Sequence, residues 1–204
     1  MISIIDYRAG NLTSVERALK YLGMPCRITE KPREIASSER VIFPGVGAAG
    51  KAMEVIMSLN LDKVIHDVIA RKIPFLGICL GAQIILDGSE EDNATCLKII
   101  PGVSRRFSDV GVKIPHMGWN DISIGRSHPI FKDINPEVQF YFVHSYYPEP
   151  ENHENIIATT HYGVPFASVI GLGNVVATQF HPEKSGRYGL QILKNFCEWD
   201  GEVE

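Results

Sequence analysis

The pattern of hydrophobic and polar residues changes about halfway along the chain. In the first half, short and almost wholly apolar runs alternate with stretches whose apolar residues recur every three or four positions. Such a pattern is typical of a parallel sheet that helices cover on both faces. It predicts strands at 2–6, 26–29, 40–43 and 74–78, and helices at 11–22, 49–58, 61–72 and after residue 79.

The second half is rich in strand-like segments separated by turn residues. We predict strands within 138–148, 155–163, 166–173 and 174–180, with a hairpin loop at 171–174. A final amphipathic helix is predicted from about 186 to 199. The chain has no internal repeat and no linker rich in Pro, Gly or Ser. We therefore expect one α/β domain over residues 1–204, with a mixed, mostly parallel central sheet flanked by helices.

Composition and charge narrow the classes of function. The chain has 204 residues and a net charge of −4, which argues against general nucleic-acid binding because that needs a basic face. No apolar run approaches the ~18 residues of a membrane span, and the first residues lack the basic region of a signal peptide. The four cysteines form no C-x-x-C pair. We therefore expect free thiols in a cytoplasmic protein, with no metal and no cofactor.

Residues 77–81, Gly-Ile-Cys-Leu-Gly, place a cysteine where a strand passes into a helix. This is the spacing of a nucleophile elbow with cysteine in the serine position. The nucleophile of such an elbow has a strained backbone, and the flanking glycines avoid collisions in the tight turn. The N–H groups at the start of the helix favour the thiolate. We therefore predict that Cys79 is a nucleophile; the alternative is a buried core cysteine between two glycines.

A nucleophilic cysteine needs a base, and the base needs a group that orients it. Among the seven histidines, His181 closes a strand-like segment and is followed by Pro182 and Glu183. In an extended chain His181 and Glu183 point the same way, so the carboxylate can fix the imidazole tautomer. The alternative is a surface His-Pro-Glu turn. His116 and His144 also stand out, because apolar sequence surrounds them.

Residues 43–50, Phe-Pro-Gly-Val-Gly-Ala-Ala-Gly, contain the G-x-G-x-x-G pattern of dinucleotide-binding loops. A non-catalytic nucleotide-binding module is therefore a rival interpretation. Two features disfavour it. The pattern does not follow the first strand, and the acidic residue about 20 positions on, Asp67, lies in a helical pattern rather than at a strand end.

Taken together, GICLGAQ, PGVG and HPE resemble the class I, triad-type glutamine amidotransferase family, over essentially the whole chain. Further segments are similar to one branch of it, the glutaminase subunits of imidazole glycerol phosphate synthase: DYRAGN (6–11), IPGVSRRF (100–107), PHMGWN (115–120), YFVHSYY (141–147) and HPEKSG (181–186). A glutaminase of another synthase, such as anthranilate synthase, would share the triad but is not expected to carry these segments together. One departure is Arg8, where glycine is frequent.

The resemblance implies a class I glutamine amidotransferase fold and a Cys79–His181–Glu183 triad. The triad would hydrolyse glutamine to glutamate and ammonia through a thioester on Cys79. The family places oxyanion donors at the N–H groups of Leu80 and, in our assignment, Val46. It implies that glutamine is held by further groups along the chain: Gly45, Gly47, Gln83, Glu91 and the backbone of Ser145 and Tyr146.

The resemblance also implies a protein partner. In the family, a cyclase subunit that is a (β/α)₈ barrel forms a heterodimer with the glutaminase and receives ammonia through an internal channel. The cyclase makes imidazole glycerol phosphate and an aminoimidazole carboxamide ribotide, AICAR, in histidine biosynthesis. In the family, the partner's ligand activates the glutaminase, and the PGVG strand (residues 44–47) is our candidate for the element that turns. We expect the interface and its gate at Asn11, Trp119, Asn120, Tyr141 and Lys184.

Overall fold

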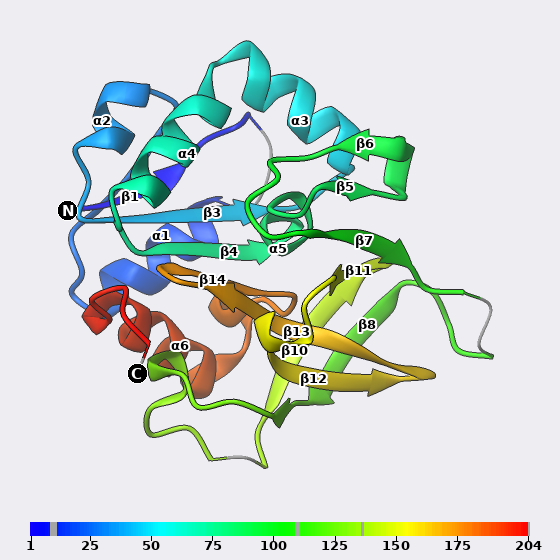
Figure 1. Cartoon of the computed structure of the whole chain (residues 1–204). Coiled ribbons are helices and arrows are strands. Elements are labelled where there is room, and N and C mark those ends of the chain that lie inside the picture. The colour runs from blue at the N-terminus through cyan, green and yellow to red at the C-terminus, as the bar shows by residue number, and fades with distance from the viewer. Residues whose placement is uncertain (9–11, 109–110, 136, 204) are drawn as a thin grey trace.

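An eight-stranded sheet forms the centre of the protein (Figure 1). The computed structural model describes residues 1–8, 12–108, 111–135 and 137–203. From one edge to the other, the strands are β2 (Cys26–Thr29), β1 (Ile2–Ile5), β3 (Arg40–Gly45), β4 (Phe75–Cys79), β14 (Val175–Thr178), β13 (Val164–Leu172), β12 (Ile156–Tyr162) and β9 (Ser123–Ile124). The strands from β2 to β14 run parallel, and the rest are antiparallel. The predicted mixed, mostly parallel sheet is confirmed.

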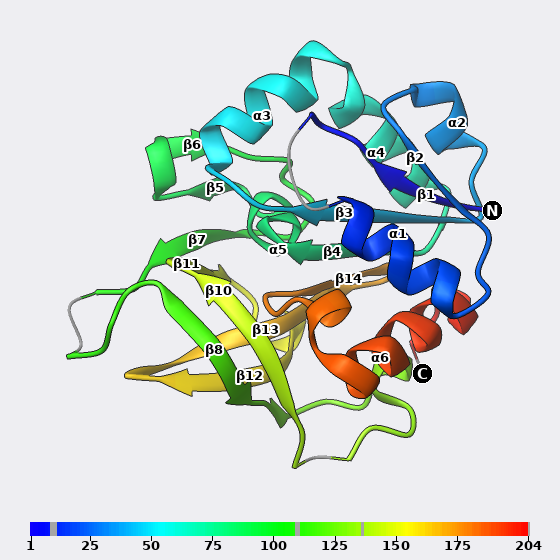
Figure 2. The ribbon, with the colours of Figure 1, turned by 180° about the vertical axis from the view of Figure 1, so that it is seen from behind.

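Helices cover both faces of the parallel part of the sheet (Figures 1 and 2). One face carries α1 (Leu12–Tyr21) and α6 (Gly186–Glu198), and the other carries α2 (Pro32–Ala36), α3 (Ala49–Ser58) and α4 (Leu61–Ala70). Each long helix buries one stripe; in α4 it consists of Leu61, Val64, Ile65 and Val68, at helical spacing. Among the described residues, no helix is long and apolar enough to cross a membrane.

Residues 138–148 do not form one strand, and that prediction is wrong. The chain leaves one sheet and enters another at Ser145. Before it, β10 (Gln139–His144) pairs with β8 (His116–Asp121). After it, β11 (Tyr146–Pro150) joins a sheet with β7 (Gly102–Arg106), β5 (Gly88–Ser89) and β6 (Ala94–Thr95). The apolar character runs through the junction, but partners distant in sequence decide the pairing.

The hairpin predicted at 171–174 is confirmed, because Leu172 of β13 pairs with Val175 of β14. Within the described ranges, four short 3₁₀ helices lie in the connections: η1 (Glu91–Asn93), η2 (Pro129–Phe131), η3 (His153–Asn155) and η4 (Pro182–Lys184). Of these, η4 follows β14 at the carboxyl edge of the parallel strands. It carries the His-Pro-Glu segment into the region where β4 also ends.

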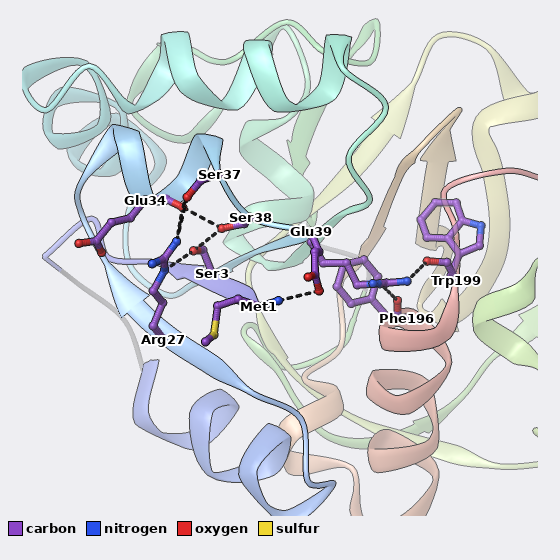
Figure 3. A network of polar contacts seen from close by, with 10 residues as sticks. Met1, Ser3, Arg27, Glu34, Ser37, Ser38, Glu39, Phe196 and Trp199 are labelled. Carbon is purple, nitrogen blue, oxygen red and sulfur yellow. Dashed lines mark hydrogen bonds and ion pairs between the residues drawn. The ribbon is translucent and has the colours of Figure 1, made fainter.

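Polar contacts join the amino-terminal ends of the sheet strands to the helices (Figure 3). Arg40 of β3 donates to the carbonyls of Phe196 (3.2 Å) and Trp199 (2.7 Å), at the end of α6. Its positive charge also suits the negative end of a helix. On β1, the Ser3 hydroxyl lies 2.6 Å from that of Ser38, beyond α2. These contacts hold α2 and α6 against the amino-terminal ends of the strands, whereas the His-Pro-Glu segment lies at the carboxyl ends.

Candidate active site

Cys79 ends β4 and stands in a strained turn immediately before α5 (Leu80–Ile84). Its backbone has φ 54° and ψ −102°, a conformation that L-residues rarely adopt. Glycine is required on both sides. A Cβ on Gly77 would lie 2.8 Å from the Gly81 carbonyl, and one on Gly81 would lie 2.4 Å from the Phe43 oxygen. The fold thus presents the sulfur at the carboxyl end of a central strand.

His181 and Glu183 form a buried pair beside this elbow. Because β14 and β4 are parallel neighbours, their carboxyl ends bring η4 and Cys79 to the same edge of the sheet. The His181 Nδ1 atom lies 2.8 Å from Glu183 Oε1, and each side chain is only 2% exposed. The Ser185 hydroxyl donates to the His181 carbonyl at 2.7 Å. The His-Pro-Glu segment is therefore a buried, hydrogen-bonded unit rather than a surface turn.

The surroundings of His181 favour its charged form. Burial of the ring opposes protonation, but the Cys79 sulfur and the Glu183 carboxylate outweigh it and raise the pKa of His181 to about 10. Its Nε2 atom is buried and has no hydrogen-bond partner in the part of the chain that the structure describes. That nitrogen is free to exchange a proton with a group in the site.

A cavity of ≈ 320 Å³ opens beside the sulfur. Most of the residues that the sequence singled out for glutamine lie on its walls. The lining consists of Val46, Gly47, Cys79, Leu80, Gln83, Glu91, Pro115, Val143, His144, Ser145 and Tyr146. Segments far apart in the chain thus form one pocket: the residues after β3, the β4–α5 elbow, η1 and the β10–β11 junction.

The PGVG strand passes close to the elbow, as a Cβ on Gly45 would lie 2.6 Å from the Leu80 Cβ. Gly47 has φ 104°, a backbone conformation in which a residue with an L side chain would be strained. The Val46 N–H, expected at the oxyanion, instead donates to the Tyr7 hydroxyl at 2.9 Å. In this structure the donor that the sequence analysis assigned to the oxyanion is therefore occupied within the protein.

Glu91 occupies the N-terminus of α3. Its Oε2 atom accepts from the Ala49 N–H at 2.7 Å, and burial raises the pKa of this carboxyl. In a dinucleotide-binding loop the pyrophosphate takes this place. Gly50, which completes the G-x-G-x-x-G pattern, lies within α3, where a Cβ would lie 2.9 Å from the Asp92 side chain. Asp67 lies in α4 and pairs with Arg71 rather than ending a strand.

Gln83 ties α5 to the β10–β11 junction. Its Nε2 atom donates to the Tyr146 carbonyl at 2.8 Å and to the Gln179 Oε1 atom at 3.1 Å. Gln83 is buried, but it still lines the pocket. It therefore supports the segment expected to hold glutamine, in addition to facing the cavity.

A second polar chain reaches the same carbonyl from β8. His144 Nδ1 lies 2.8 Å from the Tyr146 oxygen, His116 Nδ1 lies 3.0 Å from His144 Nε2, and Asn120 Nδ2 lies 3.2 Å from His116 Nε2. Burial lowers the pKa of His116 to about 4 and that of His144 to about 3, so both rings are neutral. One set of tautomers satisfies every contact, with each donor directed toward Tyr146.

The residues expected at an interface gather on β8, β10 and η4. Trp119 is 54% exposed, and its ring meets that of its strand partner Tyr141 at 6.1 Å. The Lys184 Nζ atom lies 6.0 Å from the centre of the Tyr141 ring. Asn120 lies on the same strand as Trp119. Asn11 lies outside the described residues; Arg8, near it in the chain, pairs with Glu30 at 3.0 Å.

Two residues in this region escaped the sequence analysis. Tyr7 contacts the PGVG strand, and Gln179 contacts the nucleophile, with its Nε2 atom 3.6 Å from the Cys79 sulfur. Gln179 stands two positions before His181, so the alternation of an extended chain could have placed both on one side. In the described ranges, no three His, Cys, Asp or Glu side chains gather as a metal site would require.

Comparison with known proteins agrees with this geometry. Residues 3–199 match the family model "Glutamine amidotransferase class-I". The imidazole glycerol phosphate synthase subunit HisH of Maridesulfovibrio salexigens is 50% identical over 210 residues, which cover 100% of this chain and 99% of the relative. The HisH subunit of Dehalococcoides mccartyi is 49% identical over 197 residues, covering 96% of each chain.

Solved structures share the fold at low sequence identity. A crystal structure of a glutamine amidotransferase superposes with a TM-score of 0.77 at 15% identity and covers 98% of both chains. The structure of PurLQS from Thermotoga maritima also gives 0.77, at 16% identity and 97% coverage of both chains. With the family match and the full-length relatives, these results show that the chain belongs to the class I glutamine amidotransferase family, in the branch of imidazole glycerol phosphate synthase HisH subunits.

Proposed function

We propose that this chain hydrolyses glutamine with Cys79 as nucleophile, His181 as acid and base, and Glu183 as the group that orients His181. The observation that carries the proposal is the strained Cys79 elbow beside a buried His181–Glu183 pair, with a pocket at the sulfur. The same arrangement of nucleophile, base and carboxylate supports acyl transfer on other folds.

His181 takes the thiol proton, and the Cys79 thiolate attacks the side-chain carbonyl carbon of glutamine. The carbon–nitrogen bond breaks as His181 returns the proton to the departing nitrogen, so ammonia leaves and a glutamyl thioester remains. Water, deprotonated by His181, then cleaves the thioester to glutamate and restores the thiol. The raised pKa of His181 supports its role as the acid of the first step.

The tetrahedral intermediates carry an oxyanion that needs backbone donors, and losing one typically costs about 10²–10³ in rate. We assign these donors to the N–H groups of Leu80 and Val46. Because the Val46 N–H is bonded to Tyr7, the proposal requires this peptide to turn before it can bind the oxyanion. Gly45 and Gly47 on either side permit such a turn.

We propose that glutamine is held by Gln83, Glu91 and the backbone of Ser145 and Tyr146, with Gly45 and Gly47 beside its side chain. The common pocket of Gln83, Glu91 and the β10–β11 junction supports this assignment. Glu91 brings a carboxylate to the pocket wall, and its charge suits the amino group of glutamine.

The chain is the glutaminase subunit of imidazole glycerol phosphate synthase, and its relatives are named imidazole glycerol phosphate synthase subunit HisH. We propose that its partner is a (β/α)₈ cyclase that receives ammonia without release to water and makes imidazole glycerol phosphate and AICAR. The exposed Trp119, the Tyr141 ring and the Lys184 ammonium support an interface on β8, β10 and η4. Asn120 and Asn11 complete this proposed contact and gate.

The test is glutamine hydrolysis by the chain alone, with the cyclase subunit, and with the cyclase carrying its ligand. We expect hydrolysis to rise when the loaded partner is present and to vanish in Cys79→Ala. Cys96→Ala, which alters another buried thiol, is the matched control. A glutamine-like electrophile should label Cys79 in the complex. Hydrolysis that ignores the partner would contradict the coupled subunit, and absence of both hydrolysis and labelling in the complex would contradict the glutaminase.

A further inference from the structure

We propose that Gln179 is a further catalytic residue, whose side-chain amide donates a hydrogen bond to the Cys79 sulfur and stabilises the thiolate. This rests on the proposed role of Cys79 as a nucleophile. Gln179 follows β14, two positions before His181, and its Nε2 atom lies 3.6 Å from the sulfur. It therefore contacts the reacting atom from the same segment that supplies the base.

The orientation of the Gln179 amide follows from a chain of contacts anchored on a backbone carbonyl. The Tyr146 oxygen can only accept, so the group of Gln83 that lies 2.8 Å from it is the NH₂ group. The same NH₂ group lies 3.1 Å from the next amide, which must present its oxygen there. The Gln179 NH₂ group is therefore the end that faces the sulfur, because the opposite orientation would set two NH₂ groups against each other.

Burial increases the energetic importance of the contact between Gln179 and the sulfur. The Gln179 side chain is 0% exposed, and glutamine is rarely buried to this extent. Its backbone is also fixed, since its N–H donates to the Ser168 carbonyl at 2.8 Å. A buried amide without partners would be costly. The two contacts to Gln83 and Cys79 satisfy both ends of the side chain and hold it in one position.

Two groups in contact with the sulfur act in opposite directions on its charge. The Val143 carbonyl, 3.9 Å away, can accept from the thiol but repels a thiolate. The Gln179 N–H donates and so favours the thiolate. A hydrogen bond to a charged group in a buried site is stronger than one between neutral groups. Gln179 thus adds to the effect of His181 without itself gaining or losing a proton.

The test is the pH dependence of Cys79 alkylation by iodoacetamide, with the modified cysteine identified by peptide mass spectrometry. This reagent lacks the amino-acid groups of glutamine, so it reports on the sulfur alone. In Gln179→Met, which keeps the length of the side chain but lacks the donor, we expect the pH midpoint of alkylation to rise by about one unit. In Gln179→Glu, a carboxylate faces the sulfur and the midpoint should rise further. Gln191→Met, on α6, is the matched control, because Gln191 contacts Asn195 and not the site.

A second variant keeps the proposal testable if neither change at Gln179 folds. Gln83→Met removes the group that orients the Gln179 amide, so the midpoint should rise in the same direction by a smaller amount. If Gln83 served only to bind glutamine, alkylation by iodoacetamide would be unchanged. A wild-type midpoint in the folded Gln179 variants, or in folded Gln83→Met, overturns the proposal.

The outcome is separable from that of the proposed function. An unchanged midpoint together with partner-dependent glutamine hydrolysis by the wild type rejects the role of Gln179 and leaves the glutaminase standing. A raised midpoint without hydrolysis by the wild-type complex rejects the glutaminase and leaves the hydrogen bond to the sulfur standing. Circular dichroism and thermal melting establish which variants are folded.

Discussion

The Tyr7 hydroxyl binds both polar groups of Val46. It donates to the Val46 carbonyl and accepts from the Val46 N–H, each at 2.9 Å. Burial raises the pKa of Tyr7 to about 12, so the hydroxyl keeps the proton that it donates. The ring is fixed by stacking on Phe43 at 4.9 Å. Tyr7 therefore holds the PGVG strand and occupies the Val46 N–H, which must leave this hydrogen bond before it can bind an oxyanion at Cys79.

Tyr7→Phe should increase glutamine hydrolysis by the isolated chain. The variant keeps the ring and its stacking but releases the Val46 peptide, whose residue is 37% exposed and so accessible to water. The hydrogen bond to Tyr7 opposes the turn of the Val46 peptide. Because the variant removes that opposing free energy, the rate should rise about two- to tenfold. The measurement is glutamate release without the cyclase subunit.

Tyr188→Phe is the control for that change, because its hydroxyl accepts from Arg187 rather than from the PGVG strand. Its hydrolysis should match that of the wild type. Unchanged or slower hydrolysis by folded Tyr7→Phe would show that the Tyr7 hydroxyl does not restrain the strand. The ratio of rates with and without the loaded partner should also fall in Tyr7→Phe, since less of the activation remains for the partner to supply.

Glu183→Gln should move the alkaline limb of the pH profile to lower pH. Glu183 and Cys79 together raise the pKa of His181 to about 10, so the imidazolium persists through neutral pH and is lost as the pH rises through that value. Glutamine preserves the size of the side chain but removes its charge. The pKa of His181 should then fall, and the acid of the first step is lost at lower pH.

The pH profile of kcat/KM for the complex measures this shift. At neutral pH, kcat/KM should fall less in Glu183→Gln than in His181→Ala, for which the loss of acid–base catalysis predicts about 10²–10⁴-fold. Glu198→Gln, on the exposed side of α6, should leave the profile unchanged. An alkaline limb that stays in place in Glu183→Gln would mean that the Glu183 charge does not act on His181.

Gly81→Ala should destabilise the protein and impair the site together. The added Cβ would lie 2.4 Å from the Phe43 carbonyl oxygen, so β3 and α5 must separate. Such overpacking reduces the free energy of unfolding by about 1–3 kcal/mol, which corresponds to about 2–4 °C of melting temperature per kcal/mol. Gly125→Ala is the control, since its Cβ would have only an ordinary contact at 3.8 Å. Equal melting temperatures for the two variants would contradict the close approach.

Arg40→Met should lower stability without altering catalysis. The variant keeps the aliphatic part of the side chain but loses the donors to Phe196 and Trp199 at the end of α6. Hydrogen bonds from a charged donor predict a loss of about 1–3 kcal/mol in the free energy of unfolding. Denaturant unfolding measures it, with Arg33→Met on α2 as the control, because the Arg33 side chain is exposed. A loss as small as that of the control would show that Arg40 does not stabilise this end of α6.

Local patterns predicted most of the elements because hydrophobic periodicity is a property of neighbouring residues. The strand at 26–29 and the helix at 49–58 have the predicted bounds. The pattern did not predict the division of 138–148 into two strands, and it missed strands β5 to β9, because sheet pairing there depends on partners elsewhere in the chain. The motifs at Cys79 and at His181 with Glu183 were visible in sequence because each is a short segment with its own stereochemistry.

The sequence by itself determined the family, the alternation of strands and helices, and which residue types could carry the chemistry. Only the tertiary structure decided that Val46 is held by Tyr7, 39 positions away, and that the amide of Gln179 meets the sulfur of Cys79, 100 positions away. The physical reason is that hydrogen bonds depend on distances between atoms, and the sheet sets those distances by bringing strand ends together. A local pattern can supply a donor or an acceptor, but the partner of each is chosen by the packing of the whole chain.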